Sequence, residues 1–145
     1  MTLVDKLLIL AVAAQVLLTM AIVVWMGFER VPRVARGEIA VKDIAVDRAA
    51  YPLRARLLSN SFDNQFQLPV LFYVAVLLAL WNGGAGWVEA VLAWLFVALR
   101  YVHAAIHVTV NRVDQRFAVF AAGLVVLALL WVWLVLRLVL LAPSV

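Results

Sequence analysis

The sequence predicts an all-α integral membrane protein, a bundle of four transmembrane helices in a single membrane domain over residues 1–145. Hydrophobic residues make up 68% of the chain and charged residues only 14%, whereas a soluble domain is roughly half apolar and a quarter charged. A soluble domain this small could not bury so much apolar surface, but a lipid bilayer solvates it directly. The apolar residues also fall into separate runs, and each run predicts one membrane-spanning helix.

The first apolar run, Leu7–Phe28, is 22 residues long and contains no charged residue. A helix of that length crosses about 30 Å of hydrocarbon, and the run is too long for the core of a signal peptide. We expect a retained helix over about residues 5–29, followed by a polar link over about 30–49. The second run, Leu68–Trp81, is shorter, so we expect its helix to start earlier and to cover about 50–82.

The third and fourth runs complete the predicted bundle. Trp87–Val110 predicts a helix over about residues 86–111, and Phe117–Ala142 predicts a helix over about 115–142. The fourth run is interrupted by a single charge, Arg137. Because arginine side chains are long, we expect this one to extend toward the membrane interface.

The distribution of basic residues predicts the orientation of the helices. The hairpin Asn82–Gly86 has no charge, whereas the segment 29–63 carries many basic side chains. Cytoplasmic links of membrane proteins are enriched in Lys and Arg. We therefore expect a multi-pass protein of the bacterial inner membrane with this segment inside and both termini outside. The basic residues of the segment are Arg30, Arg33, Arg36, Lys42, Arg48, Arg54 and Arg56.

Two stripes of polar residues lie within the predicted second and third helices. Spacings of three and four residues place each stripe on one helix face, and charged groups that face lipid cost several kcal/mol. Both stripes must therefore face protein or water. We expect these two helices, or a neighbouring subunit, to enclose a polar pocket at the cytoplasmic end. The stripes are Arg56, Asn60, Asp63, Asn64 and Gln67 on the second helix, and Arg100, His103, His107 and Asn111 on the third.

The residues leave two interpretations of this pocket open. Amide and imidazole side chains can simply join transmembrane helices by hydrogen bonds, or the ionisable groups can bind a ligand. His103 and His107 have a spacing that can chelate zinc, but Arg100 lies one turn away and would repel a cation, so we expect no metal site. The chain has no cysteine for a disulfide, a thiolate ligand or a nucleophile. No basic run is interleaved with aromatic residues, so no nucleic-acid partner is expected.

The two stripes resemble motifs of the MAPEG superfamily, the membrane-associated proteins of eicosanoid and glutathione metabolism, in a bacterial-type form. The family typically has Asn-x-x-Glu followed closely by Pro and Leu-Phe, then Arg-x-x-His-x-x-x-Tyr on the third helix and an arginine at the start of the fourth. The resemblance covers essentially the whole chain. The matching residues here are Asn64-Gln-Phe-Gln67-Leu-Pro69-Val-Leu-Phe72-Tyr and Arg100-x-x-His103-x-x-x-His107-x-x-x-Asn111-x-x-x-x-Arg116-Phe117.

The resemblance implies a homotrimer of four-helix bundles and a glutathione site between neighbouring subunits near the cytoplasmic end. It implies that Arg116 stabilises the glutathione thiolate and is the catalytic residue. A thiol has a pKa of about 8.5 and becomes a good nucleophile when a nearby cation lowers that value. The resemblance also implies glutathione as the cofactor. The glutathione-binding residues would be Asn60, Asn64, Gln67, Arg100, His103, His107 and Arg30.

Three departures from the family pattern support a second hypothesis. Gln67 stands where glutathione-using members have Glu, Asn60 where many have Arg, and His107 where a tyrosine is usual. The first hypothesis is therefore a glutathione-dependent transferase or peroxidase that acts on lipophilic electrophiles or lipid hydroperoxides. The alternative is a non-catalytic membrane subunit that uses the same scaffold for oligomerisation, lipid binding or docking in a larger membrane complex.

The predicted orientation can be tested with single cysteines, because the chain has none of its own. We expect an impermeant thiol reagent added to intact cells to label Ala85→Cys and to spare Lys42→Cys, since basic links face the cytoplasm. Permeabilised cells, in which both positions react, provide the control. Labelling of position 42 alone in intact cells means that the orientation is reversed.

Overall fold

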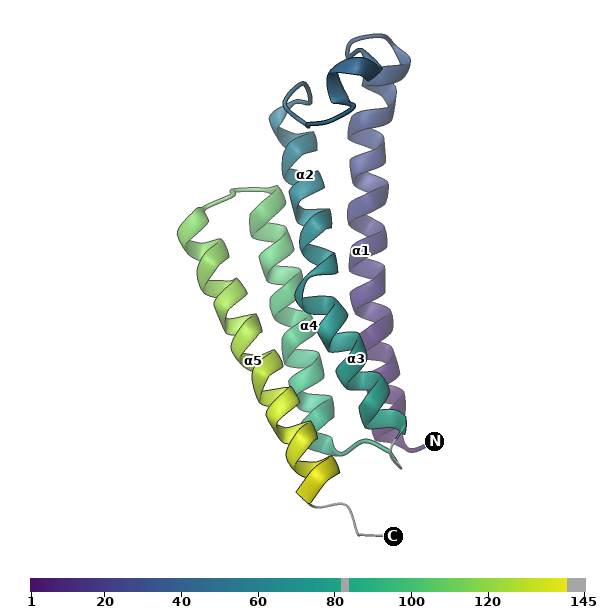
Figure 1. Ribbon diagram of the computed structural model, residues 1–145, viewed down its shortest axis with the longest axis vertical. Helices are drawn as coiled ribbons and strands as arrows, with labels where there is room; N and C mark the ends of the chain where they lie inside the picture. Colours follow the sequence, from purple (N-terminus) through teal and green to yellow (C-terminus); the bar gives the residue numbers. More distant parts are fainter. Residues whose placement is uncertain (82–83, 141–145) are drawn as a thin grey trace.

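The computed structural model describes residues 1–81 and 84–140, and every regular element within these ranges is helical (Figure 1). Four segments are long and apolar enough to cross a membrane: Leu3–Ala35, Leu53–Trp81, Trp87–Val108 and Val113–Val139. The predicted all-α, four-span architecture is therefore confirmed. The elements in chain order are α1 (Leu3–Ala35), η1 (Val41–Ile44), α2 (Leu53–Asp63), η2 (Asn64–Phe66), α3 (Leu68–Trp81), α4 (Trp87–Val108) and α5 (Val113–Leu140).

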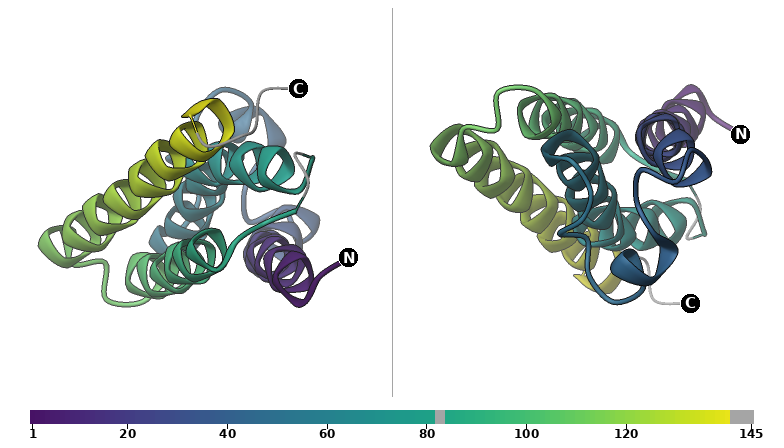
Figure 2. Two further views of the ribbon diagram at one scale, coloured as in Figure 1. Left: turned by 90° about the horizontal axis from the view of Figure 1, so that it is seen from below. Right: turned by 90° about the horizontal axis from the view of Figure 1, so that it is seen from above.

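The helices run side by side along one long axis, and α4 lies between α1 and α5 (Figures 1 and 2). Helix α1 packs against α2, α3 and α4, and α5 packs against α4 and α3. We call the end with η1 and the α4–α5 turn the link end. The opposite end, where α1 begins and α5 finishes, is the terminal end.

Helix α1 is longer than the sequence predicted. It continues past residue 29 to Ala35 and contains Pro32. A proline inside a helix removes one backbone hydrogen bond, and here the side chain of Arg33 donates to the nearby carbonyl of Glu29 at 2.8 Å. The irregular link is consequently shorter and later than expected, and α1 and α2 both extend beyond the α4–α5 turn (Figure 1).

The second span is broken, where the sequence predicted one continuous helix. Helix α2 ends at Asp63, a turn of 3₁₀ helix follows, and Gln67 has φ −98° and ψ −104° before α3 begins. Pro69 accounts for the break, because its ring nitrogen has no hydrogen to donate and its ring clashes with the carbonyl of the preceding turn.

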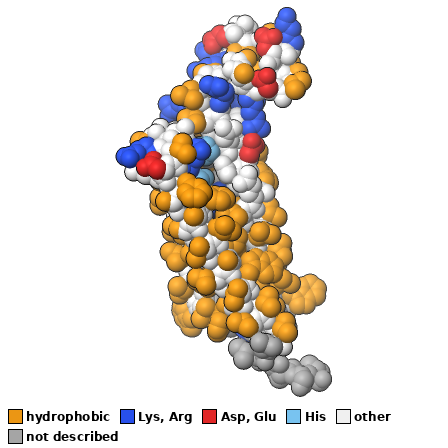
Figure 3. Space-filling view, turned by 60° about the vertical axis from the view of Figure 1, so that its left-hand side comes forward, with side chains coloured by type: hydrophobic (Ala, Val, Ile, Leu, Met, Phe, Trp, Pro, Cys, Tyr) orange, Lys and Arg blue, Asp and Glu red, His pale blue; other side chains and the backbone are white. Residues whose placement is uncertain are grey.

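The core lies where α3, α4 and α5 meet. Phe72 of α3 stacks on Phe96 of α4 with ring centroids 4.9 Å apart, and both side chains are fully buried. Leu127, Leu130 and Leu134 of α5 close the same cluster. Large apolar side chains also cover the outer surface below the link end (Figure 3), as expected for a protein whose outer solvent is lipid.

A charged pair joins α4 to α5 at the terminal end and shows which groups Arg137 binds there. Its Nη1 lies 2.8 Å from Oε1 of Glu89, which is 1% exposed. The same guanidinium donates to the carbonyls of Gly84 and Ala79 at 3.0 and 3.2 Å. Arg137 therefore turns into the bundle, because a buried carboxylate and two carbonyls lie within its reach. Asn82 and Gly83 of the predicted hairpin, and the predicted helix end at 142, lie outside the described residues.

The Glu89–Arg137 pair yields a stability prediction. Arg137→Met should destabilise the protein by about 3 kcal/mol, because it leaves a buried carboxylate without its cation. The double variant Arg137→Met with Glu89→Gln should recover most of that loss, since a neutral amide can still accept from the Gly86 N–H, which donates to Glu89 at 3.1 Å. Thermal unfolding in a mild detergent provides the measurement. A double variant no more stable than Arg137→Met would show that the unpaired carboxylate is not the cause of the loss.

Candidate functional site

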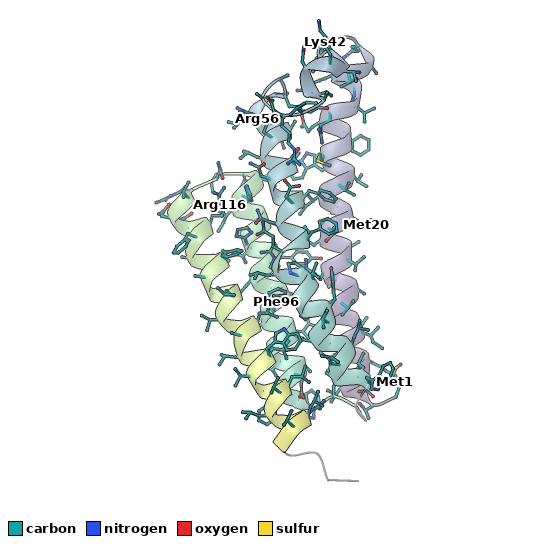
Figure 4. All side chains as sticks on the ribbon, in the orientation of Figure 1. Met1, Met20, Lys42, Arg56, Phe96 and Arg116 are labelled. Atoms are coloured by element: carbon teal, nitrogen blue, oxygen red, sulfur yellow. The ribbon has the colours of Figure 1, made fainter. Side chains whose placement is uncertain are left out.

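A polar cavity of about 280 Å³ lies near the link end, between α2 with η2 on one side and α4 with α5 on the other. The two histidines of the chain appear in a hollow beside basic side chains (Figure 3). Along the bundle, Arg116 lies between Arg56, nearer the link end, and Phe96, deep in the core (Figure 4). The cavity is lined by Asn60, Asn64, Gln67, His103, His107, Val113, Arg116, Phe117 and Phe120.

Helix α4 contributes the imidazoles. His103 and His107 are both buried, with their rings edge to face at a centroid distance of 5.7 Å. His103 also contacts Phe120 of α5, at 5.9 Å between ring centroids. Within the described part of the chain, Nδ1 of His103 and both ring nitrogens of His107 have no hydrogen-bond partner. These nitrogens therefore have unused hydrogen-bonding capacity inside the bundle, next to the cavity.

The broken second span contributes the amides. Asn60, Asn64 and Gln67 line the cavity, and Nδ2 of Asn64 donates to the Asn60 carbonyl at 2.9 Å. In the single chain Asn60 and Gln67 are exposed and Asn64 is half-buried. One wall of the cavity is thus open in the isolated subunit.

The other two members of the predicted stripe on this span, Arg56 and Asp63, do not line the cavity. Asp63 is exposed and accepts two hydrogen bonds from Arg48, at 2.6 and 3.2 Å. These bonds hold the pKa of the Arg48 guanidinium above its ordinary value. Arg56 lines a neighbouring hollow that shares only Asn60 with the cavity. Asp63 is therefore engaged with the link and supplies no carboxylate to the site.

Arg116 stands in the first turn of α5 and is held by the turn that precedes it. Its Nη1 donates to Oδ1 of Asn111 at 2.7 Å. Asn111 has φ +47°, a left-handed conformation that asparagine tolerates better than most residues. The positive end of the α5 dipole adds to the charge of the guanidinium. An anion or a thiolate in the cavity would be stabilised by both.

Arg100 lies one turn deeper than His103 on the same face of α4, and it is 1% exposed. Its Nη2 donates to the Asn64 carbonyl at 2.8 Å. Nε and Nη1 are buried and have no hydrogen-bond partner among the residues that the structure describes. Arg100 does not itself line the cavity. It is hydrogen-bonded to Asn64 and lies next to His103, and these two residues do line the cavity.

Sequence reasoning missed a buried amide pair that supports the site. Nε2 of Gln15 in α1 donates to Oε1 of Gln65 at 2.9 Å, and Gln65 donates to the Ser61 carbonyl at 3.0 Å. Both glutamines are at most 1% exposed. The pair ties α1 to the 3₁₀ turn and so fixes Asn64 and Gln67 on either side of it. The signal in the sequence was a lone glutamine within the uncharged first span.

Arg30, also predicted to bind glutathione, is placed elsewhere by the structure. Its guanidinium lies 4.2 Å from the ring centroid of Tyr51. It borders a mainly apolar groove of about 560 Å³ between α1, η1 and Tyr51. Within one chain it therefore does not contribute to the cavity around Arg116.

Comparison with known proteins gives one match. A family model described as the MAPEG family matches residues 8–136, nearly the whole chain. No curated protein and no solved structure matches the chain significantly.

The turn that holds Arg116 yields a prediction. Asn111→Gly and Asn111→Ala both remove the hydrogen bond to Arg116, but only glycine adopts a positive φ without steric cost. Asn111→Ala should therefore be less stable than Asn111→Gly by about 1–2 kcal/mol. Thermal unfolding of the two purified variants measures the difference. Equal stabilities would mean that the turn does not depend on the left-handed conformation.

Proposed function

The chain belongs to the MAPEG family, and on that premise we propose that it is a glutathione-dependent transferase or peroxidase. Its substrates would be lipophilic electrophiles or lipid hydroperoxides that enter from the bilayer. The observation that supports this proposal best is the polar cavity between helices at the link end. In it the guanidinium of Arg116 stands at a helix N-terminus beside two imidazoles, three of whose nitrogens have no hydrogen-bond partner among the described residues.

The chemistry begins with the thiol of glutathione. A cation next to the sulfur lowers the thiol pKa and raises the thiolate fraction at neutral pH. The thiolate then displaces a leaving group from an electrophilic carbon or adds to an activated double bond, whose other carbon takes up a proton. With a hydroperoxide it bonds to the terminal oxygen, the O–O bond breaks and the alcohol is released. A further glutathione then converts the sulfenic acid to the disulfide and water. Arg116 is the catalytic residue of this proposal, and Asn60, Asn64, Gln67, His103 and His107 would position the tripeptide.

A homotrimer belongs to the same proposal. Asn60 and Gln67 line the cavity yet are exposed in the single chain, so a neighbouring copy would supply the missing wall. Polar groups left facing lipid are costly, which gives the subunits a physical reason to associate there. Arg30 lies apart from the cavity of its own chain. It could therefore bind glutathione only if it reached the cavity of a neighbouring subunit. The proposed setting is the bacterial inner membrane, with the link inside and both termini outside.

A second candidate function has its own supporting observation. Among the described residues of this chain that line the cavity, none is Asp or Glu, so they offer no carboxylate to pair with the ammonium group of glutathione. This favours a non-catalytic subunit that uses the scaffold for oligomerisation, lipid binding or docking in a larger membrane complex. A glutathione titration of the purified protein separates the two candidates, because only the first requires binding.

The catalytic role of Arg116 is testable by absorbance. We expect bound glutathione to show thiolate absorbance near neutral pH, because the cation stabilises the ionised sulfur. Arg116→Ala should abolish that signal and leave assembly intact, since the side chain is only half-buried at a helix start. Arg116→Lys should restore it in part, because lysine keeps the charge without the planar fork of donors.

Arg112→Ala is the matched control, since Arg112 is exposed and pairs with Asp114 at 3.4 Å rather than lining the cavity. It should keep the full thiolate signal. An undiminished signal in Arg116→Ala would exclude Arg116 as the activating group.

A further inference from the structure

A mainly apolar groove of about 560 Å³ runs along α1 toward η1, apart from the cavity around Arg116. Its α1 residues recur every three or four positions, so they lie on one face of the helix. From Val23 to Ala35 this face extends over about 18 Å at the rise of an α-helix. A long apolar groove suits a chain molecule better than a compact one. On α1 the lining residues include Val23, Met26, Gly27, Arg30, Val31 and Val34.

The groove passes from the apolar part of the bundle into its charged part. Val23 and Gly27 belong to the uncharged run Leu7–Phe28, and basic side chains gather above that level at the link end (Figure 3). Farther along, the groove is lined by Val31 and by Val41 of η1, which are 65% and 67% exposed. Exposed apolar surface rimmed by polar residues commonly marks a binding site. The groove therefore lies at the expected membrane surface and is fitted to a partly apolar occupant.

Arg30 is the one charged residue among the described residues that line the groove. Its guanidinium lies 4.2 Å from the ring centroid of Tyr51, and its Nη1 contacts Sδ of Met26 at 3.6 Å. A thioether is only a weak acceptor, and neither contact supplies a negative charge. The neighbouring Arg33 has a carboxylate partner, Glu29, at 3.4 Å, whereas no ion pair of Arg30 occurs within residues 1–81 and 84–140. The groove thus offers a cation without a counter-ion beside an apolar wall.

We propose that the groove binds one anionic phospholipid per subunit, with an acyl chain along α1 and the phosphate on Arg30. Charge complementarity identifies this occupant. The apolar wall accommodates the chain, and a guanidinium is a preferred partner of phosphate oxygens. Anionic lipids of the cytoplasmic leaflet attract basic side chains, and this is the side on which we expect the link. The inference goes beyond the proposed function, since it requires neither glutathione binding nor catalysis.

Other occupants match only one part of the groove. An apolar helix of a second copy, or the chain of an uncharged lipid, would cover Val31 and Val41 but bring no anion to Arg30. A small free anion such as inorganic phosphate would leave the apolar wall uncovered. An anionic phospholipid supplies both the chain and the charge.

Gly27 gives the groove its open space at the level of the uncharged run. A Cβ built on Gly27 meets no heavy atom within 4 Å. Glycine in a helix interior is less favourable than alanine, so the position gains nothing in helix stability from lacking a side chain. A larger side chain at this position would project into the groove and occupy the volume assigned to the acyl chain.

Native mass spectrometry of the purified full-length protein tests the charge requirement. The probes are phosphatidylglycerol and phosphatidylethanolamine with identical acyl chains, which differ in net charge because the second carries an ammonium group. The first lipid retained per subunit should be phosphatidylglycerol, by about fivefold or more, since one basic side chain near an anionic lipid contributes about that factor. Arg30→Gln should bring this ratio close to one.

Arg36→Gln is the matched control for the loss of charge. Arg36 belongs to the same end of the bundle, pairs with Glu38 at 2.7 Å and does not line the groove, so its variant should keep the native ratio. Each ratio compares two lipids on one protein, so a general loss of stability affects both lipids equally.

A second pair of variants tests the place of the chain. Gly27→Phe should remove most of the bound lipid of both kinds, because the ring fills the groove, whereas Gly27→Ala adds one methyl group and should retain it. Equal retention of the two lipids by the native protein would overturn the proposal, and so would equal ratios in Arg30→Gln and Arg36→Gln. Full lipid retention by Gly27→Phe, or dissociation of its oligomer, would also overturn it, since the groove would then hold something other than this lipid.

Discussion

The hydrogen bond from Arg100 to the Asn64 carbonyl is the contact on which the site depends. It places a guanidinium that is 1% exposed against the one point where the second span is not α-helical, at 2.8 Å. A regular helix uses its carbonyls within itself, so a break is where a buried cation readily finds a backbone acceptor. The break and the buried arginine are therefore parts of one arrangement, which lies behind Asn64 and His103 in the wall of the cavity.

A break in a membrane-spanning helix is tolerated where other parts of the protein cover it. Irregular backbone exposed to lipid leaves polar groups unsatisfied at a cost of several kcal/mol. Here Gln15 of α1 reaches the 3₁₀ turn through Gln65, and Arg100 of α4 reaches it from the other side. The resulting rigid turn separates Asn64 from Gln67 and directs both toward α5. Pro69 prevents the chain from relaxing into a continuous helix.

The sequence predicted the four spans and the family, because long apolar runs and motif spacing are local signals. The sequence also predicted most of the cavity residues, because helical periodicity alone places His103 and His107 on one face of their helix. It did not predict the inward turn of Arg137, the pairing of Asp63 with Arg48 or the position of Arg30. Each depends on which distant group lies within reach once the helices pack, and periodicity carries no such information. The break at Gln67 was foreseeable in part, because Pro69 marks it, but the partners that stabilise it were not.

A structure of the protein in lipid nanodiscs with bound glutathione tests the account most directly. The account predicts a trimer with the ligand in the cavity and its sulfur beside the guanidinium of Arg116. Glutathione bound away from Arg116 would contradict it.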